Sequence, residues 1–139
     1  MVVDPDCIFC KIVAGEIPCF KLYEDELTMS FMDINPAAPG HCLVIAKEHA
    51  PNVFEIDEGA LASVIRTAKR VASAVNAALA PEGINLLQAN GPGAAQSVEH
   101  LHFHILPRSV GDDLLLNWPV EAGDMEAIGE LAERIRGHI

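Results

Sequence analysis

The fold of this sequence is decided by the segment His100-Leu101-His102-Phe103-His104-Ile105-Leu106-Pro107-Arg108. Its three histidines stand at every second position, and large apolar residues lie between them. Because side chains alternate between the two faces of a β-strand, this period of two predicts a strand. All three imidazoles would project from one face, while Leu101, Phe103 and Ile105 would pack into a core on the other.

The rest of the chain predicts further short strands and one long helix. The helix would run from Asp57 to Leu79, with Asp57 or Glu58 as its N-cap, because apolar residues recur there at helical spacing. We expect strands at Phe20–Glu24, Thr28–Met32, His41–Ala46, Ile84–Ala89 and from Val98 or Glu99 to Arg108, loops at 33–40 and 90–97, and a second helix at Met125–Arg136. Such an order predicts an α+β fold with a mainly antiparallel sheet of five strands, in a single domain over residues 1–139.

Composition narrows the class of protein. Hydrophobic residues make up 50% of the chain and charged residues 21%, which is typical of a globular protein. The net charge of −11 argues against binding along nucleic acid but not against binding a small nucleotide. No apolar run reaches the ~18 residues of a membrane helix, so no membrane partner is expected. Four cysteines without a signal peptide favour reduced thiols or a metal site in a cytoplasmic protein.

Three imidazoles on one face need a function. Charging them together would be repulsive, and burying them unpaired would be costly. They could bind a metal through neutral rings. Alternatively, one could be a nucleophile that its neighbours orient while they bind an anion. The small, polar segment Asn90–Ser97 favours the second interpretation, because such a loop can direct backbone N–H groups at a phosphate.

Together these features resemble the histidine-triad (HIT) family of nucleotide hydrolases and transferases. His100–Leu106 matches every position of that family's signature. Cys7–Pro18 resembles the family's N-terminal segment, and Phe31–His41 resembles its nucleoside-binding loop. Gln96–Val98 is similar to the branch of histidine-triad nucleotide-binding proteins, whereas the ending Leu106-Pro107-Arg108 is shared with the dinucleoside polyphosphate hydrolases, so the branch stays open.

The resemblance implies the roles of the site residues. His102 would attack the α-phosphorus of a nucleoside 5′-phosphate derivative and form a covalent nucleotidyl-histidine, which water hydrolyses. His104 would hydrogen-bond the phosphoryl oxygens and assist proton movement to the leaving group, and Asp33 would accept hydrogen bonds from the ribose. The resemblance places Ser97, as a further catalytic residue, and Gln96 near the phosphate and leaving group. It places Asn90 near the phosphate and ribose, and His41 near the phosphate. The base would lie in an apolar slot lined by Ile8, Phe9, Ile12, Phe31, Ile34 and Leu43.

The leading hypothesis is therefore an enzyme that cleaves the P–N bond of a phosphoramidate of a purine nucleotide such as AMP or GMP. Three alternatives remain: a dinucleoside polyphosphate hydrolase, a nucleotide-binding regulatory protein with vestigial catalysis, and a metalloenzyme with the triad as ligands. One departure from the family is Ala95, where glycine is common; its methyl group would disfavour a positive φ or narrow the phosphate pocket.

Cys7 and Cys10 form a second motif. Two thiolates at this spacing can form half of a tetrahedral zinc site, and His49 and His100 are candidates for the other half. In a subset of the family this arrangement binds a structural zinc ion. The alternative is a pair of free thiols. Zinc binding further requires that His100 turn away from the other two histidines, which strict alternation along a strand does not allow.

The family also implies a homodimer in which two domains form one extended sheet. Trp118, the only tryptophan, has two candidate roles. It could anchor the C-terminal segment on its own domain, or reach the active site of the partner subunit.

Overall fold

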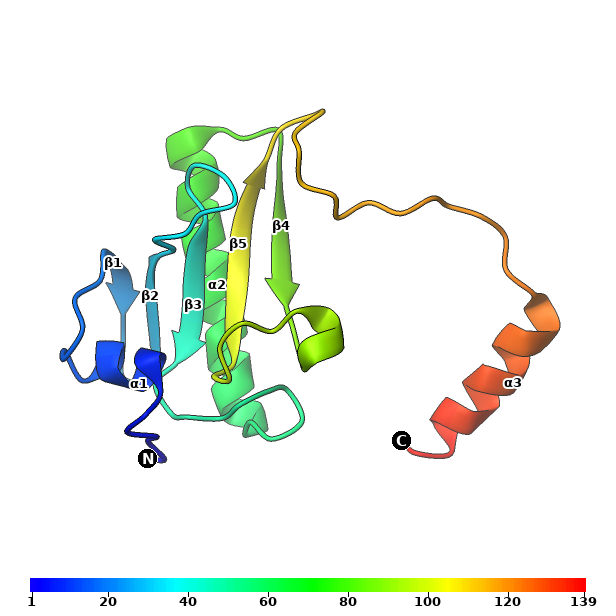
Figure 1. The fold of residues 1–139 in the computed structure, drawn as a ribbon, viewed down its shortest axis with the longest axis horizontal. Helices are drawn as coiled ribbons and strands as arrows, with labels where there is room; N and C mark the ends of the chain where they lie inside the picture. The colour runs from blue at the N-terminus through cyan, green and yellow to red at the C-terminus, as the bar shows by residue number, and fades with distance from the viewer.

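A five-stranded antiparallel sheet forms the centre of the computed structural model, which describes residues 1–139 (Figure 1). In space the strands follow the order β1-β2-β3-β5-β4. They comprise β1 (Lys21–Glu24), β2 (Thr28–Met32), β3 (Cys42–Ala46), β4 (Gly83–Gln88) and β5 (His102–Arg108). The predicted α+β fold is confirmed, and β1 to β4 begin or end within one residue of their predicted limits.

The long helix α2 (Glu58–Leu79) joins β3 to β4 and covers one face of the sheet (Figure 1). As predicted, Asp57 is its N-cap, and the Asp57 carboxylate accepts a hydrogen bond of 3.1 Å from the backbone N–H of Ala60. The buried stripe of α2 packs against apolar residues of β3 and β5. Leu101 and Ile105 belong to this cluster and the partly buried Phe103 packs against it, so the apolar face of the histidine segment was predicted correctly.

The predicted start of β5 at Val98 or Glu99 is wrong, because the strand begins at His102. The neighbouring strands explain this. Ile45 pairs with His102, and the pairing of β3 with β5 extends no further towards the start of the segment. The chain before His102 is instead held by a loop, where the N–H of Leu101 donates to the carbonyl of Ala50 at 2.7 Å. His100 therefore lies in a bend outside the sheet.

Helix α1 (Ile8–Val13) covers the other face of the sheet, and the apolar pattern did not predict it. Its buried residues pack against Phe31 of β2 and against Leu43 and Ile45 of β3. In the register of the sheet, Leu43 is opposite His104 and Ile45 is opposite His102. Both histidines of β5 therefore project to the face that α1 covers.

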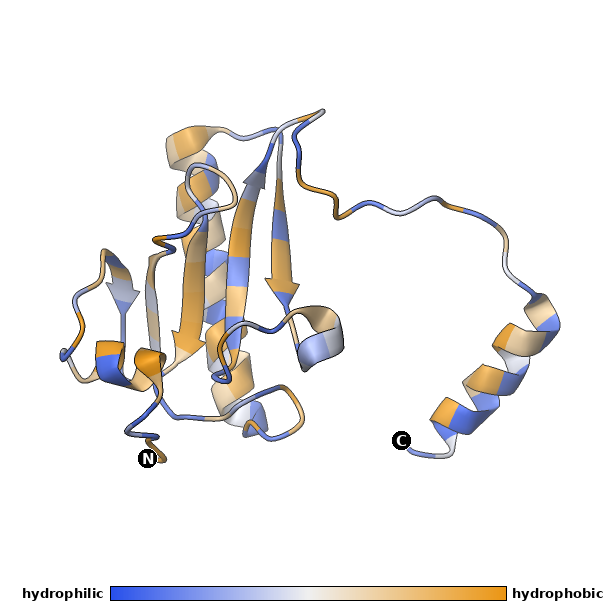
Figure 2. Cartoon of the chain, viewed as in Figure 1, coloured by the Kyte–Doolittle hydropathy of each residue, from blue (hydrophilic) through white to orange (hydrophobic).

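The C-terminal helix α3 (Met125–Arg136) forms as predicted but lies away from the sheet, at the end of an extended segment (Figure 1). One stripe of α3 is hydrophobic (Figure 2), and its Ile128, Leu131 and Ile135 are half-exposed. Trp118 in the extended segment is 78% exposed, so it does not anchor this segment on its own domain. None of the helices has the length and apolar character needed to cross a membrane.

Candidate functional site

A cavity of about 500 Å³ opens between α1 and the sheet. It is lined by His102 and His104 of β5, together with Asp33, His41 and Ser97. The six residues predicted for the base slot also line it: Ile8, Phe9, Ile12, Phe31, Ile34 and Leu43. The structure thus brings together an apolar slot, a carboxylate and several imidazoles within one cavity.

Six further lining residues were not predicted. Ile17, Pro18 and Cys19 follow α1 in sequence and form one side of the cavity, with Met32, Asn35 and Val98 elsewhere on its wall. Because each lies within two residues of a predicted segment or in it, the resemblance to the family's N-terminal segment and nucleoside-binding loop was the signal that could have found most of them.

The ring of His102 is held in one tautomer by the backbone. Its Nδ1 lies 2.6 Å from the carbonyl oxygen of His100. A carbonyl can only accept, so Nδ1–H donates and the lone pair of the neutral ring is on Nε2. Burial lowers the pKa of His102, which keeps the ring neutral near pH 7. The rings of His102 and Phe9 also pack edge to face, with centroids 5.2 Å apart. A buried, oriented imidazole with a free Nε2 is a competent nucleophile.

His104 stands beside His102, with ring centroids 4.8 Å apart. Its Nδ1 lies 2.9 Å from Nε2 of His41. Burial, followed by repulsion from His102 and His41, lowers the pKa of His104 to about 4. His104 is therefore also neutral near pH 7, and it lines the cavity beside His102.

Gln96 and Asn90 do not line the cavity. The Gln96 amide donates to the carbonyls of Pro51 and Val98 and accepts from the N–H of Gly91. Asn90 accepts from the N–H of Val53 and exchanges two hydrogen bonds with Gln88. Both amides hold the loop in front of β5, where Ser97 lies. Their predicted contact with a nucleotide stays a prediction.

The same loop contains a backbone strain at Ala95. Its φ of 58° is in the left-handed region, which the sequence indicated would be unfavourable for a residue with a methyl group. Ala95 follows the short 3₁₀ helix η1 (Pro92–Ala94), and its N–H donates to the carbonyl of Pro92 at 3.1 Å. The chain accepts this strain directly before the residues that lead into the site.

Arg108 lies at the far end of β5, and the structure gives it a structural partner. The guanidinium makes hydrogen bonds of 2.7 and 2.6 Å to the carboxylate of Asp112, and it also donates to Asn85 and the carbonyl of Leu114. Arg108 does not line the cavity of the histidines. The residue shared with the dinucleoside polyphosphate hydrolases is therefore engaged elsewhere.

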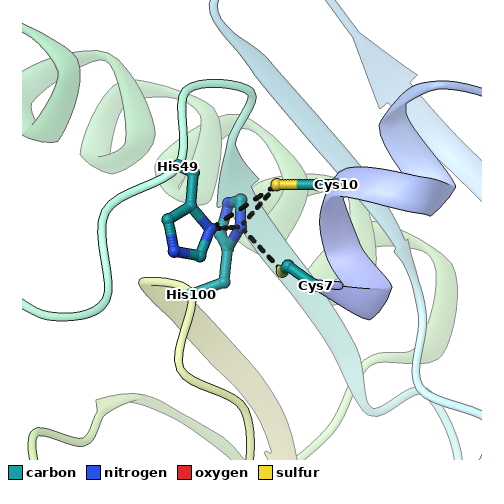
Figure 3. A group of neighbouring side chains, drawn as sticks. All are labelled: Cys7, Cys10, His49 and His100. Carbon is teal, nitrogen blue, oxygen red and sulfur yellow. Dashed lines mark hydrogen bonds between the residues drawn. The ribbon is translucent and has the colours of Figure 1, made fainter. Parts of the chain in front are cut away.

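A second cluster lies where α1 meets the bend before β5. Cys7, Cys10, His49 and His100 each offer one ligand atom, and these atoms all lie within 4.8 Å of one another (Figure 3). Nδ1 of His100 is 3.4 Å from Sγ of Cys7, 3.7 Å from Sγ of Cys10 and 3.2 Å from Nδ1 of His49. The turn of His100 away from the other histidines, which zinc binding required, results from its place in the bend.

This donor set fits zinc. Bonds of about 2.3 Å to sulfur and about 2.0 Å to nitrogen place tetrahedral ligand atoms about 3.3–3.8 Å apart, which is close to the observed separations. The ring of His100 has the required tautomer, because its Nε2–H donates to the carbonyl of Ala46 at 2.7 Å and leaves the lone pair on Nδ1. Nε2 of His49 faces the carboxylate of Asp4 at 3.8 Å.

Comparison with known proteins identifies the class of protein. The HIT domain family model matches residues 14–111, and the chain belongs to the HIT family. An adenosine 5′-monophosphoramidase of Schizosaccharomyces pombe is 43% identical over 134 residues, which cover 96% of this chain and 98% of that protein.

Solved structures agree with this assignment. A protein of Streptococcus mutans superposes with a TM-score of 0.92 at 38% identity, covering 97% of this chain and 86% of that one. A zinc-bound histidine triad family protein of Mycobacterium smegmatis gives a TM-score of 0.75 at 34% identity, covering 93% of this chain and 91% of that one.

The depressed pKa of His104 predicts a loss of stability in acid. The pKa is about 4 in the folded chain and 6.5 for an ordinary histidine, so the unfolded chain binds this proton more readily. The stabilisation is therefore complete above pH 6.5 and is lost as the pH falls towards 4, at no more than about 1.4 kcal/mol per pH unit. The free energy of unfolding, measured in urea, should decrease between pH 7 and pH 5. This decrease should be smaller by about 1 kcal/mol in His104→Asn than in the wild type. Equal losses would contradict this assignment.

Proposed function

We propose that this protein hydrolyses the P–N bond of a nucleoside 5′-phosphoramidate through a nucleotidyl intermediate on His102. The observation that carries the proposal is the fixed tautomer of His102, which presents a free Nε2 in a cavity of the size and lining that a nucleotide needs. The relative in Schizosaccharomyces pombe, named an adenosine 5′-monophosphoramidase, supports the same reaction class.

The cavity accounts for each part of the nucleotide. The base lies in the apolar slot, and the ribose hydroxyls donate to Asp33. The α-phosphate then reaches His102, His104 and Ser97. The slot has aliphatic and phenyl walls, which discriminate weakly between adenine and guanine, so derivatives of both AMP and GMP are expected substrates.

The reaction proceeds in two displacements at phosphorus. In the first, the lone pair of His102 Nε2 forms a bond to phosphorus while the P–N bond breaks, and the amine leaves with the electron pair and takes up a proton. In the second, water attacks phosphorus, loses a proton and displaces His102, which regains its free Nε2. His104 and Ser97 lie at the same end of the cavity and stabilise the charge on the phosphoryl oxygens.

This reaction predicts a trapped intermediate. Rapid acid-free quenching during turnover of adenosine 5′-phosphoramidate should leave a nucleotidyl group on His102, detected by peptide mass spectrometry and lost on treatment with acid. His102→Ala should lower kcat by about 10³-fold or more, because the nucleophile is absent. His138→Ala, which changes an exposed histidine at the C-terminus, serves as the control. Turnover of His102→Ala at the wild-type rate would exclude the mechanism.

We also propose a structural zinc ion held by Cys7, Cys10, His49 and His100. The near-tetrahedral spacing of the donor atoms supports it, as does the zinc-bound relative of Mycobacterium smegmatis. The ion would join α1 to the segment after β3 and to the bend before β5. A cytoplasmic location, as the cysteine content predicts, would keep both thiols reduced and available.

The zinc proposal predicts that metal follows the cysteines and not the catalytic histidine. Cys10→Ser should lose its zinc and unfold at a lower temperature, because metal binding contributes to folding. Cys19→Ser, with a cysteine outside the cluster, and His102→Ala should both retain zinc. Elemental analysis and thermal unfolding measure these outcomes. Loss of zinc from His102→Ala would instead support a metal bound by the triad.

We further propose a homodimer in which β4 strands of two copies pair. β4 is an edge strand, and an unpaired edge can add a further strand. Leu86 on this strand is 46% exposed, and the apolar stripe of α3 has no cover within its own domain. A second copy supplies partners for both surfaces.

The dimer proposal predicts that a charge at the β4 edge favours the monomer. Leu86→Lys should shift the mass measured by light scattering from that of two chains towards that of one, because the interface would bury an unpaired ammonium group. Leu27→Lys changes a leucine that is 51% exposed beside the opposite edge strand, and it should leave the dimer intact. A dimeric Leu86→Lys protein would contradict pairing through β4.

A further inference from the structure

His41 is a buried histidine next to the catalytic pair, and its tautomer is set by the backbone. Its Nδ1 lies 2.9 Å from the backbone nitrogen of Ala37, whose N–H can only donate. Nδ1 therefore has the lone pair, and the proton of the neutral ring is on Nε2. Burial lowers the pKa of His41, which favours this neutral form.

The single Nε2–H of His41 faces two acceptors. Nδ1 of His104 is 2.9 Å from His41 Nε2, and Oδ2 of Asp33 is 3.4 Å from it. The other carboxylate oxygen of Asp33 already accepts from the N–H of Asn35 at 2.8 Å. Oδ2 is thus the oxygen that competes with His104 for the proton of His41. Asp33 also lines the cavity, where a sugar hydroxyl can reach it.

The same three side chains are close enough to hold a cation, since one ligand atom from each lies within 4.8 Å of the others. The tautomer of His41 argues against a cation. Its Nε2 has a proton and not a lone pair, and binding a metal there would break the hydrogen bond from Ala37. The cluster is therefore a hydrogen-bonded chain.

We propose that Asp33, His41 and His104 form a relay that couples ribose binding to the orientation of His104; this inference rests on the proposed function. When ribose hydroxyls donate to Asp33, its carboxylate attracts the proton of His41 less strongly. The Nε2–H of His41 then donates fully to Nδ1 of His104. This fixes the His104 ring with its own proton on Nε2, the nitrogen that can donate to a phosphoryl oxygen.

His41 acts in this relay as a positioning residue, because it works through His104. The relay separates two effects of the ribose. Contact with Asp33 contributes to binding and therefore to KM. The ordering of His104 contributes to the reaction and therefore to kcat, by about tenfold if one oriented hydrogen bond is gained.

The test compares adenosine 5′-phosphoramidate with its 2′,3′-dideoxy analogue. In the wild type, the ratio of the two kcat values should be about 10, in favour of the ribose. In His41→Leu, which has no N–H donor, this ratio should fall to about 1, while the ratio of the KM values stays as in the wild type. His41→Gln, which keeps an N–H donor, should retain a larger kcat ratio than His41→Leu. The control His138→Ala changes an exposed histidine outside the cavity and should behave as the wild type does.

Equal kcat ratios in the wild type and in His41→Leu would overturn the relay. A wild-type protein that turns over neither substrate would contradict the proposed function and not the relay, so a second measurement needs no turnover. The ¹⁵N chemical shift of His104 Nδ1 in the wild type should change more on saturation with AMP than with 2′,3′-dideoxy-AMP. Equal changes with the two nucleotides would likewise overturn the relay.

Discussion

The hydrogen bond from His102 to the carbonyl of His100 connects the two centres of this protein. It spans 2.6 Å and sets the tautomer of the proposed nucleophile. The residue that supplies the carbonyl directs its own side chain into the cysteine and histidine cluster. The position of His100 therefore decides both whether that cluster can hold a metal and which nitrogen of His102 is free. Both depend on the bend that precedes β5.

Neighbouring histidines have opposite tautomers for local reasons. His102 donates through Nδ1 to a carbonyl, whereas Nδ1 of His104 faces the N–H of His41 and accepts from it in the ribose-bound state proposed above. The first ring presents a lone pair at Nε2 and the second presents a proton there. A nucleophile and a hydrogen-bond donor thus arise from identical side chains two residues apart. The difference comes from their partners, one in the backbone and one in the loop before β3.

The alternation of residues could predict much of this arrangement. It placed Leu101, Phe103 and Ile105 in the core beneath α2. It could not predict the first residue of β5, because that depends on where β3 ends, in a distant part of the sequence. Most residues named from the resemblance to the HIT family line the cavity. Gln96 and Asn90 instead hydrogen-bond to Pro51 and Val53 in the loop after β3, and such partners depend on the three-dimensional fold. Helix α1, at six residues, was too short to give a periodic signal.

Helix α1 also links the base slot to the proposed zinc site. A helix of six residues is not stable alone, so its order comes from its attachments. One side of α1 supplies Cys10 to the metal cluster, and another supplies Phe9 and Ile12 to the wall of the base slot. With zinc bound as proposed, the supply of metal in the cell would govern how well this wall is formed. The affinity for nucleotide would then rise and fall with the supply of zinc in the cell, although the zinc ion does not contact the nucleotide.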